Sequence, residues 1–410
     1  MSNQPEDYGY PDRKIMHLSE DLADSDPEQN VKPSFRSLKE LIDFVSGRSF
    51  SDDTGGGGEA GFAEHLPFPF LALVGQFEMK MALILALINP AIRGVLLIGP
   101  RGTGKTTAVR GLLDLLPPVT RSTCFYGCLP EDIEDGGIDA VCPDCAKKYG
   151  EKKSFTTVDK ARLVELPLNA TLDNVIGHLD DNEQVHTRMR LKRGLLAQAD
   201  RNLLFVDEIN LLPDEIVNAI LDAASQGTYT VRRGPLSATY QARITLIGSM
   251  NPEEGQLRSQ IMDRFGLRVI VHGLDEITQR MEVYKRVKAY HRNPRQTIGQ
   301  YIEETAILAQ EIALARDMLT KVEIADEVAR QGIALIKNLR IDSLRAEITL
   351  FEAARAYASA DGRDRVLPGD LKAVANMCLR MRHSQFMEDY FTNIEKDEDE
   401  LKSCLDQTIK

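Results

Sequence analysis

The segment GPRGTGKT at residues 99–106 constrains the fold of this 410-residue chain more than any other feature. The apolar run VLLI at 95–98 comes directly before it, and a helical pattern follows over 107–116. A glycine-rich loop of the form G-x-x-x-x-G-K-[ST] between a buried strand and a helix is typical of a loop that wraps around phosphate groups. The alternative, a glycine-rich turn that matches by chance, leaves the flanking strand and helix unexplained. The segment therefore predicts an α/β fold.

Each residue type in this loop suits a phosphate ligand. The glycines allow backbone N–H groups to turn inward, toward the place where the positive end of the following helix also points. Lys105 is predicted to neutralise the outer phosphates, and Thr106 to offer its hydroxyl to Mg²⁺. We expect ATP and Mg²⁺ as cofactors, with the nucleotide held by Gly99, Gly102, Thr103, Gly104, Lys105, Thr106 and Thr107.

Short apolar runs rich in Val, Ile and Leu alternate with helical patterns between residues 65 and 273. The predicted strands are 95–99, 162–166, 203–207, 244–248 and 267–271. Such runs are typical of parallel strands that are covered on both faces. The predicted helices that follow are 275–291, 298–320, 324–339, 343–360 and 368–383. We therefore expect an α/β nucleotide-binding domain at 65–273 with a five-stranded parallel sheet, and a helical bundle domain at 274–386.

The two ends of the chain differ in charge from the middle. Residues 1–64 and 387–410 carry net charges of −8 and −5, whereas residues 65–386 sum to +1. We predict an acidic, disordered extension with a glycine-rich linker at 1–64, in which residues 38–45 form a short amphipathic helix, and an acidic tail at 387–410. The near-neutral middle argues against a broad basic surface for nucleic acid.

The apolar runs are too short to cross a membrane. The longest, MALILALI at 81–88, is far below the roughly 20 residues that a membrane helix needs. The first residues are acidic and polar, whereas a signal peptide begins with basic residues and an apolar core. We expect no membrane span and a cytoplasmic location.

Polar side chains follow two more of the predicted strands. Asp207 and Glu208 follow LLFV at 203–206, and Asn251 comes just after the strand 244–248. Ligands of open α/β sheets bind at the carboxyl ends of the strands. We predict that Asp207 holds Mg²⁺, Glu208 polarises the attacking water, and Asn251 holds the same water. A solvated acidic turn and a turn-forming Asn-Pro pair are the alternatives.

Longer segments around these motifs carry a family resemblance. The combination of VDEINLL at 206–212 with NPEEGxLRxQxxDRFG at 251–266 is specific to chelatase-type ATPases and their close relatives. The segments LPLNATLDNVIGHLD at 166–180 and SLRAEITLFEAARAYASADGR at 343–363 extend the match. Over residues 66–383, the sequence resembles the ATPase subunit I of magnesium chelatases, in the chelatase and MoxR-like branch of the AAA+ proteins.

The resemblance implies an AAA+ P-loop NTPase core and further site residues. Arg264, in DRFG, matches the family's arginine finger, which reaches the nucleotide of a neighbouring subunit; a salt-bridged surface arginine is the alternative. Arg345, in SLRAE, matches the sensor 2 arginine of the helical domain, and Asn251 matches sensor 1. The family also inserts two hairpins, for which residues 168–193 and 229–240 are available.

The resemblance also implies a function. It indicates an ATP-hydrolysing motor subunit that forms a homo-oligomeric ring, expected to be a hexamer. Its partners would be a D-type AAA+ subunit and a large H-type porphyrin-binding subunit, which together insert Mg²⁺ into protoporphyrin IX in chlorophyll biosynthesis. The alternative is a MoxR-like or cobaltochelatase-like remodelling chaperone for another metal-binding client. A DNA helicase or clamp loader is disfavoured by the near-neutral middle of the chain.

Four of the six cysteines form two close pairs, Cys124-x₃-Cys128 and Cys142-x₂-Cys145. Pairs at this spacing can present four thiolates tetrahedrally to Zn²⁺, and a reducing cytoplasm keeps the thiolates available. The intervening segment LPEDIEDGGIDAV is acidic and contains glycine. A structural zinc site is therefore one hypothesis, and redox-sensitive or unligated thiols in a surface loop are the others.

Overall fold

The computed structural model describes residues 66–383 apart from 125, 180–190 and 235. The predicted acidic extension at 1–64, its short helix at 38–45 and the acidic tail at 387–410 lie outside the described residues. No helix in the part of the chain that the structure describes is long and apolar enough to cross a membrane.

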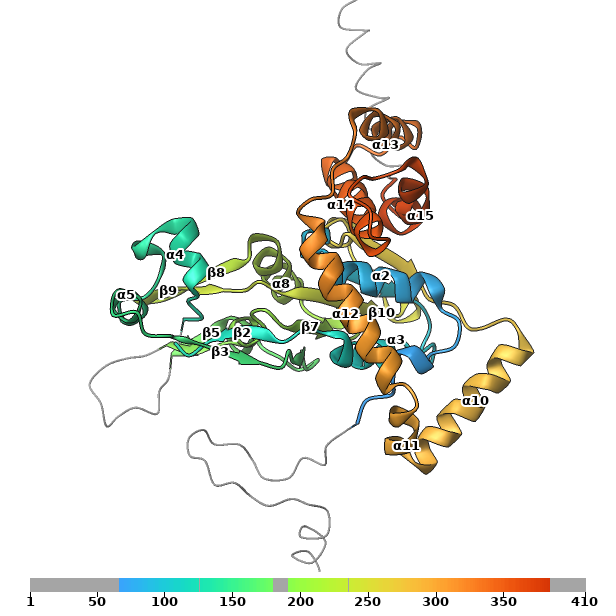
Figure 1. The fold of residues 1–410 in the computed structure, drawn as a ribbon, viewed down its shortest axis with the longest axis horizontal. Helices are drawn as coiled ribbons and strands as arrows, with labels where there is room; N and C mark the ends of the chain where they lie inside the picture. Colours follow the sequence, from blue (N-terminus) through green and yellow to red (C-terminus); the bar gives the residue numbers. More distant parts are fainter. Residues whose placement is uncertain (1–65, 125, 180–190, 235, 384–410) are drawn as a thin grey trace, which may run out of the picture. The chain divides into compact units, whose positions relative to one another are not determined.

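A five-stranded sheet forms the centre of the nucleotide-binding region (Figure 1). In spatial order its strands are β11 (Leu267–Ile270), β1 (Val95–Ile98), β10 (Thr245–Met250), β7 (Leu203–Val206) and β4 (Leu163–Glu165). Every neighbouring pair is parallel, so the predicted fold class is confirmed. Since the strands are parallel, the segments that follow them emerge at one edge of the sheet.

The sheet is buried on both faces, which explains why its strands contain almost only apolar residues. Alternate side chains of β1 and β7 enter two separate hydrophobic clusters. One cluster joins Leu97 and Phe205 to helices α2 (Phe77–Ile88) and α3 (Lys105–Gly111). The other cluster joins Leu96, Ile98, Leu204 and Val206 to helix α8 (Asp214–Gln226).

The carboxyl-terminal part of the described chain is helical. Its helices are α10 (Ile277–Arg292), α11 (Pro294–Gly299), α12 (Ile302–Leu319), α13 (Asp326–Asn338), α14 (Leu344–Ala360) and α15 (Pro368–Leu379). The single helix predicted at 298–320 is wrong at its amino-terminal end. Two helices, α11 and α12, occupy this region, and a turn at Gln300 and Tyr301 separates them.

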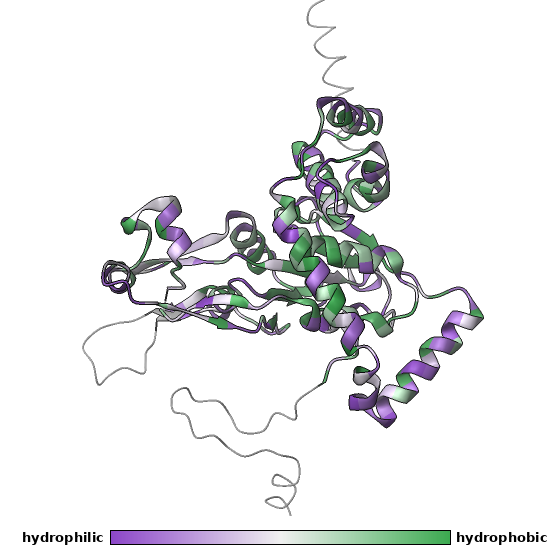
Figure 2. Ribbon diagram, viewed as in Figure 1, coloured by the Kyte–Doolittle hydropathy of each residue, from purple (hydrophilic) through white to green (hydrophobic). Residues whose placement is uncertain are grey.

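Helix α14 organises this region because its alanine-rich face lets other helices approach closely. It contacts α12, α13, α15 and also α2 of the sheet region. Ala346, Leu350, Ala353 and Ala354 are fully buried there and belong to the same cluster as α2. Helix α10 instead has no buried residue and is largely hydrophilic (Figure 2). The division into domains at 273/274 remains a prediction.

Three smaller sheets project from the core region. Strands β2 (Val119–Ser122) and β3 (Thr156–Asp159) form an antiparallel pair. The segment between these two strands contains α4 (Pro130–Gly136) and α5 (Pro143–Gly150). The two predicted hairpin insertions contain strand pairs, β5 with β6 and β8 with β9. Their bounds are Gly177–Leu179, Leu191–Arg193, Thr228–Arg233 and Leu236–Gln241.

The remaining elements are short connectors. The short α-helices are α6 (Leu172–Ile176), α7 (Leu195–Gln198) and α9 (Ser259–Met262). The 3₁₀ helices are η1 (Phe70–Ala72), η2 (Pro90–Ile92), η3 (Leu112–Leu115), η4 (Ile138–Ala140), η5 (Ile209–Leu211) and η6 (Pro252–Glu254).

Candidate nucleotide-binding site

The phosphate loop connects β1 to α3, as the sequence predicts. Gly102 and Gly104 have φ angles of 78° and 86°, a left-handed conformation that glycine adopts without strain. A Cβ atom at either position would meet open space, so the backbone conformation alone requires glycine there. Gly99 is required for another reason, because a Cβ atom on it would lie 2.1 Å from the carbonyl oxygen of Val271.

Lys105 begins α3 and is only 8% exposed. Its ammonium group donates hydrogen bonds to the carbonyl oxygens of Gly99 at 2.6 Å and Pro100 at 2.8 Å. Burial lowers the pKa of Lys105, while the nearby carboxylates of Asp207 and Glu208 act in the opposite direction. The lysine is thus held inside the loop, near the predicted magnesium ligand Asp207 and the predicted catalytic acid Glu208.

Asp207 is held by two hydroxyl groups from different elements. Thr106 Oγ1 donates to Asp207 Oδ2 at 3.0 Å, and Ser249 Oγ donates to the other carboxylate oxygen. The Ser249 hydroxyl also accepts a hydrogen bond from the backbone N–H of Glu208 at 3.2 Å. A hydroxyl beside a carboxylate is the oxygen donor set that Mg²⁺ prefers, so Thr106 and Asp207 fit the predicted ion.

Glu208 and Asn251 flank this pair. Glu208 accepts a hydrogen bond at 3.1 Å from Arg101, which also forms an ion pair with Glu254. Asn251 is 4% exposed, and its side-chain oxygen accepts from the backbone N–H of Glu253 at 3.3 Å. The described structure therefore brings the predicted acids, the amide and the phosphate loop together.

Two adjoining cavities meet at the phosphate loop. The polar cavity, of about 210 Å³, is lined by Arg101 to Thr107, Asp207, Glu208 and Ser249 to Asn251. The apolar cavity, of about 440 Å³, shares Gly102, Thr103, Gly104 and Thr107 with it. A polar compartment beside an apolar one suits a nucleotide, because phosphates need donors and cations whereas a base needs apolar walls.

Sequence reasoning missed the residues of the apolar cavity. Its walls come from the segment before α2 and from α2 itself, from Gly273 and Leu274, and from α10. Apolar contacts come from Phe68, Ala72, Leu73, Val74, Met79, Leu274, Val283 and Val287. Arg286 of α10 donates to the carbonyl oxygen of Ala72 at 3.0 Å, which ties α10 to the opposite wall. These segments are far apart in the sequence and carry no shared motif.

Arg101 and Ser249 were also missed, although each left a signal. Arg101 is a basic residue inside the phosphate loop, and Ser249 is a polar residue near the end of the buried strand β10. Their partners, Glu208 and Asp207, follow β7, which neighbours β10 and is separated from β1 by it. A polar residue at the carboxyl end of a buried parallel strand indicates a site residue, by the same argument that applies to Asn251.

Arg264 and Arg345 do not line either cavity within this chain. Arg264 pairs with Asp222 of α8 at 2.6 Å, and its side chain is 30% exposed. Arg345, near the start of α14, pairs with Asp263 at 3.4 Å. The roles that the resemblance implies for these two arginines therefore remain predictions.

Asp263 joins the sheet region to the helical region, a role that the sequence did not reveal. Besides Arg345, it forms ion pairs with Arg382 and with the fully buried Arg268 of β11. Arg268 also donates to the carbonyl oxygens of Arg380 at 3.0 Å and Met381 at 2.7 Å. Burial lowers the pKa of Arg268 to about 10. This network fixes the end of α15 against the sheet.

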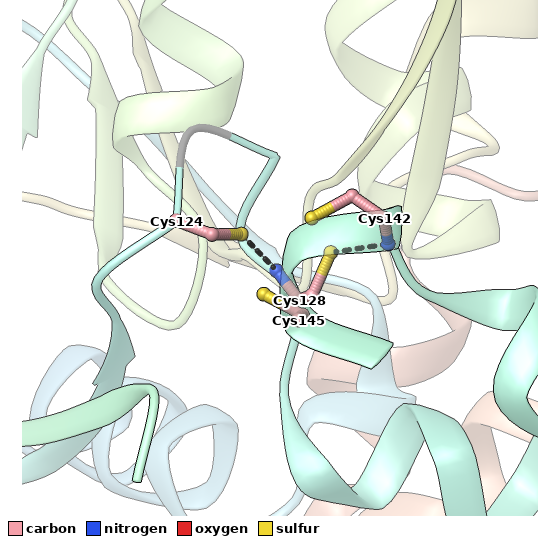
Figure 3. Close-up of side chains that lie close together, drawn as sticks. All are labelled: Cys124, Cys128, Cys142 and Cys145. Atoms are coloured by element: carbon pink, nitrogen blue, oxygen red, sulfur yellow. Dashed lines mark hydrogen bonds between the residues drawn. The ribbon is translucent and has the colours of Figure 1, made fainter. Parts of the chain in front are cut away.

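The four clustered cysteines lie together and apart from the nucleotide site. Their sulfur atoms all lie within 4.8 Å of one another (Figure 3). The sequence hypothesis that these residues form one group is thereby supported by geometry, whereas the identity of any bound metal is a separate question.

Comparisons with known proteins agree with this architecture. A family model described as an AAA domain matches residues 93–254, and one described as an AAA lid domain matches residues 332–403. A putative ATPase of Cytophaga hutchinsonii has a similar fold, with a TM-score of 0.50 at 20% identity over 76% of this chain and 84% of that chain.

Curated relatives are more similar in sequence. The magnesium-chelatase subunit ChlI homolog of Methanocaldococcus jannaschii is 43% identical over 78% of this chain and 87% of its own length. The magnesium-chelatase 38 kDa subunit of Acidiphilium rubrum is 39% identical over 77% of this chain and 90% of its own length. Because the two relatives are matched over most of their length, and the AAA family model covers the phosphate loop and the acids beside it, this chain is an AAA ATPase that belongs to the magnesium-chelatase subunit I family.

Proposed function

We propose that this chain is the ATP-hydrolysing motor subunit of a magnesium chelatase, which drives Mg²⁺ insertion into protoporphyrin IX by partner subunits. The observation that carries the proposal is the convergence of Lys105, the Thr106–Asp207 pair and Glu208 on one polar cavity. The choice of a porphyrin as the substrate of the complex is based on the relatives, which are named as magnesium-chelatase subunits, because a nucleotide site does not identify a porphyrin.

Each residue of the polar cavity is proposed to have a separate role in ATP hydrolysis. Lys105 exchanges its two carbonyl partners for phosphate oxygens, which neutralises charge on the outer phosphates. Thr106 and Asp207 hold the magnesium ion of the nucleotide, which supplies further charge neutralisation when it is bound. Glu208 polarises the attacking water once its carboxylate is released from Arg101, and Asn251 orients that water from the next strand.

Arg264 is proposed to act on the site of a neighbouring subunit in a ring. Within its own chain it lies outside both cavities and is held, partly exposed, by Asp222. An arginine presented in this way can stabilise transition-state charge across an interface. Arg345 is proposed to sense the nucleotide from the helical region by exchanging its weak pair with Asp263 for a phosphate. The ring is proposed to be a hexamer.

A D-type AAA+ subunit and an H-type porphyrin-binding subunit are the proposed partners, because the relatives are named as subunits of magnesium chelatase. The cytoplasmic location expected from the sequence is part of the same proposal.

Reconstitution tests the function directly. The purified chain is mixed with chelatase D and H subunits, protoporphyrin IX, Mg²⁺ and ATP, and Mg-protoporphyrin is followed by fluorescence. We expect product with this chain and none with Lys105→Ala. A chain that hydrolyses ATP but yields no product would contradict the chelatase function and favour the remodelling chaperone.

A further inference from the structure

The four sulfur atoms of Cys124, Cys128, Cys142 and Cys145 are spaced for a single metal ion. They lie within 4.8 Å of one another, and Figure 3 shows them converging from the two close pairs. A tetrahedral ion with metal–sulfur bonds of about 2.3 Å holds its sulfur ligands about 3.8 Å apart. An iron–sulfur cluster distributes its four cysteines over two or four iron atoms and so spreads them more widely than a single ion does. The geometry therefore fits one tetrahedral ion.

Backbone donors already point at two of these sulfur atoms. The N–H of Cys128 donates to Cys124 Sγ at 3.2 Å, and the N–H of Cys142 donates to Cys128 Sγ at 3.4 Å. Metal-bound thiolates keep negative charge, and such outer-shell donors orient them and stabilise that charge. Cys142 also immediately precedes α5, whose positive end faces the cluster.

The segment that carries the cysteines makes little apolar contact within itself. Between β2 and β3, its small cluster consists of two buried cysteines with Ile133 and Phe155, packed by partly buried neighbours. Helices α4 and α5 have 7 and 8 residues, shorter than helices that are stable alone in water. Segments of this size usually need a metal or a disulfide, and all four cysteines are free thiols in the structure.

The cysteine segment is attached to the hairpin formed by β8 and β9. The ring of Tyr126 stacks on Tyr240 of β9, with centroids 5.9 Å apart. Arg243, just after β9, bonds Asp132 of α4 at 3.0 Å and Asp200 at 3.0 Å. A further contact comes from β6, outside this hairpin, where Arg193 donates to the carbonyl oxygen of Cys124. Two of these contacts, at Cys124 and Tyr126, involve the first cysteine pair and the turn it encloses.

We propose that Cys124, Cys128, Cys142 and Cys145 bind one Zn²⁺, and that this ion holds the segment 123–155 against the β8–β9 hairpin. The ion closes the segment by joining its two cysteine pairs. The closed segment then presents Tyr126 and Asp132 to the hairpin as a fixed surface. Since none of the four cysteines lines the nucleotide cavities, the zinc site is independent of ATP binding.

Metal content is the first measurement. Protein purified without added metal is expected to contain one zinc ion per chain, as measured by inductively coupled plasma mass spectrometry. The Cys142→Ser/Cys145→Ser variant is expected to lose that zinc, whereas the control Cys378→Ser, a buried cysteine of α15, keeps it. Replacement of zinc by Co²⁺ should give the visible absorption of a tetrahedral sulfur site. Iron in place of zinc, or four freely titrating thiols without metal, would overturn the proposal.

Hydrogen exchange tests the structural role of the ion. Removing zinc from the wild-type chain with a chelator under reducing conditions should speed amide exchange in residues 228–241 as well as in 123–155. ATP affinity, measured after the chelator is removed and Mg²⁺ is restored, should stay unchanged. Because the chelated wild-type protein is used, a failure of the double variant to fold does not block the test. Zinc loss that leaves exchange in 228–241 unaltered would overturn the bracing role.

Discussion

The hydroxyl of Thr106 lies 3.0 Å from the carboxylate of Asp207, although 101 residues separate them in the chain. Thr106 is in the first turn of α3, and Asp207 follows β7, which is separated from β1 by β10. The sheet thus places a hydroxyl and a carboxylate side by side before any ion arrives. A preorganised pair needs little rearrangement to bind Mg²⁺, and five consequences of this arrangement and its surroundings can be measured.

Glu208→Gln should separate binding from hydrolysis. The amide cannot accept the proton of the attacking water, so we expect ATP turnover to fall by about 10²–10⁴-fold. ATP affinity, measured with a fluorescent analogue, should change little. Glu253→Gln, a neighbouring exposed acid outside the cavity lining, is the matched control. Unchanged turnover in Glu208→Gln would remove its catalytic role.

Lys105→Ala should weaken binding and turnover together. The ammonium group makes charge-assisted hydrogen bonds, and losing one costs about 1.5–3 kcal/mol, which corresponds to roughly 10–150-fold in Kd. Titration of a fluorescent ATP analogue measures the effect. An unaltered Kd would show that Lys105 keeps its carbonyl partners when nucleotide binds.

Arg264→Ala should lower the rate of ATP hydrolysis in the assembled ring by about 10³-fold or more, because an arginine finger contributes that much to kcat. Nucleotide binding by the single chain should persist. Mixing Arg264→Ala with Lys105→Ala creates interfaces that carry an intact Lys105 on one side and an intact Arg264 on the other. Activity should reappear on mixing, and a mixture no more active than its components would contradict action across the interface.

Ser249→Ala should raise the Mg²⁺ concentration required for half-maximal ATPase activity by about 10–100-fold, the usual effect of losing an outer-shell partner of a metal ligand. The Ser249 hydroxyl donates to Asp207 and is almost fully buried. Ser237→Ala, which changes an exposed residue of β9, is the control. A Mg²⁺ dependence equal to that of the wild type would show that Asp207 needs no support from β10.

Arg268→Ala should lower the free energy of unfolding by about 3–5 kcal/mol in urea denaturation, because it strips partners from a buried ionic network. Arg268 is 1% exposed and bonds to Met262, Arg380 and Met381 as well as to Asp263. The control Arg258→Ala removes an exposed pair with Asp214 and should cost less than about 1 kcal/mol. Equal costs would refute a linking role for Arg268.

Local sequence patterns were enough for the elements that depend on neighbouring residues. Buried parallel strands show continuous apolar runs, and the phosphate loop needs glycine for its φ angles, so both were visible in the sequence. Asp207, Glu208 and Asn251 were visible because catalytic side chains gather at the carboxyl ends of such strands. The spacing of four cysteines indicated a group, which the positions of their sulfur atoms support.

The sequence by itself therefore determined the strands, the phosphate loop and the acids that follow a strand, since each of these depends on residues adjacent along the chain. Only the tertiary structure decided the apolar cavity, whose walls come from Phe68, Met79 and Val283 on separate segments. It also decided that Asp263 joins the sheet to the helical region. Such contacts depend on how distant elements pack, and long-range packing leaves no periodic pattern in the sequence.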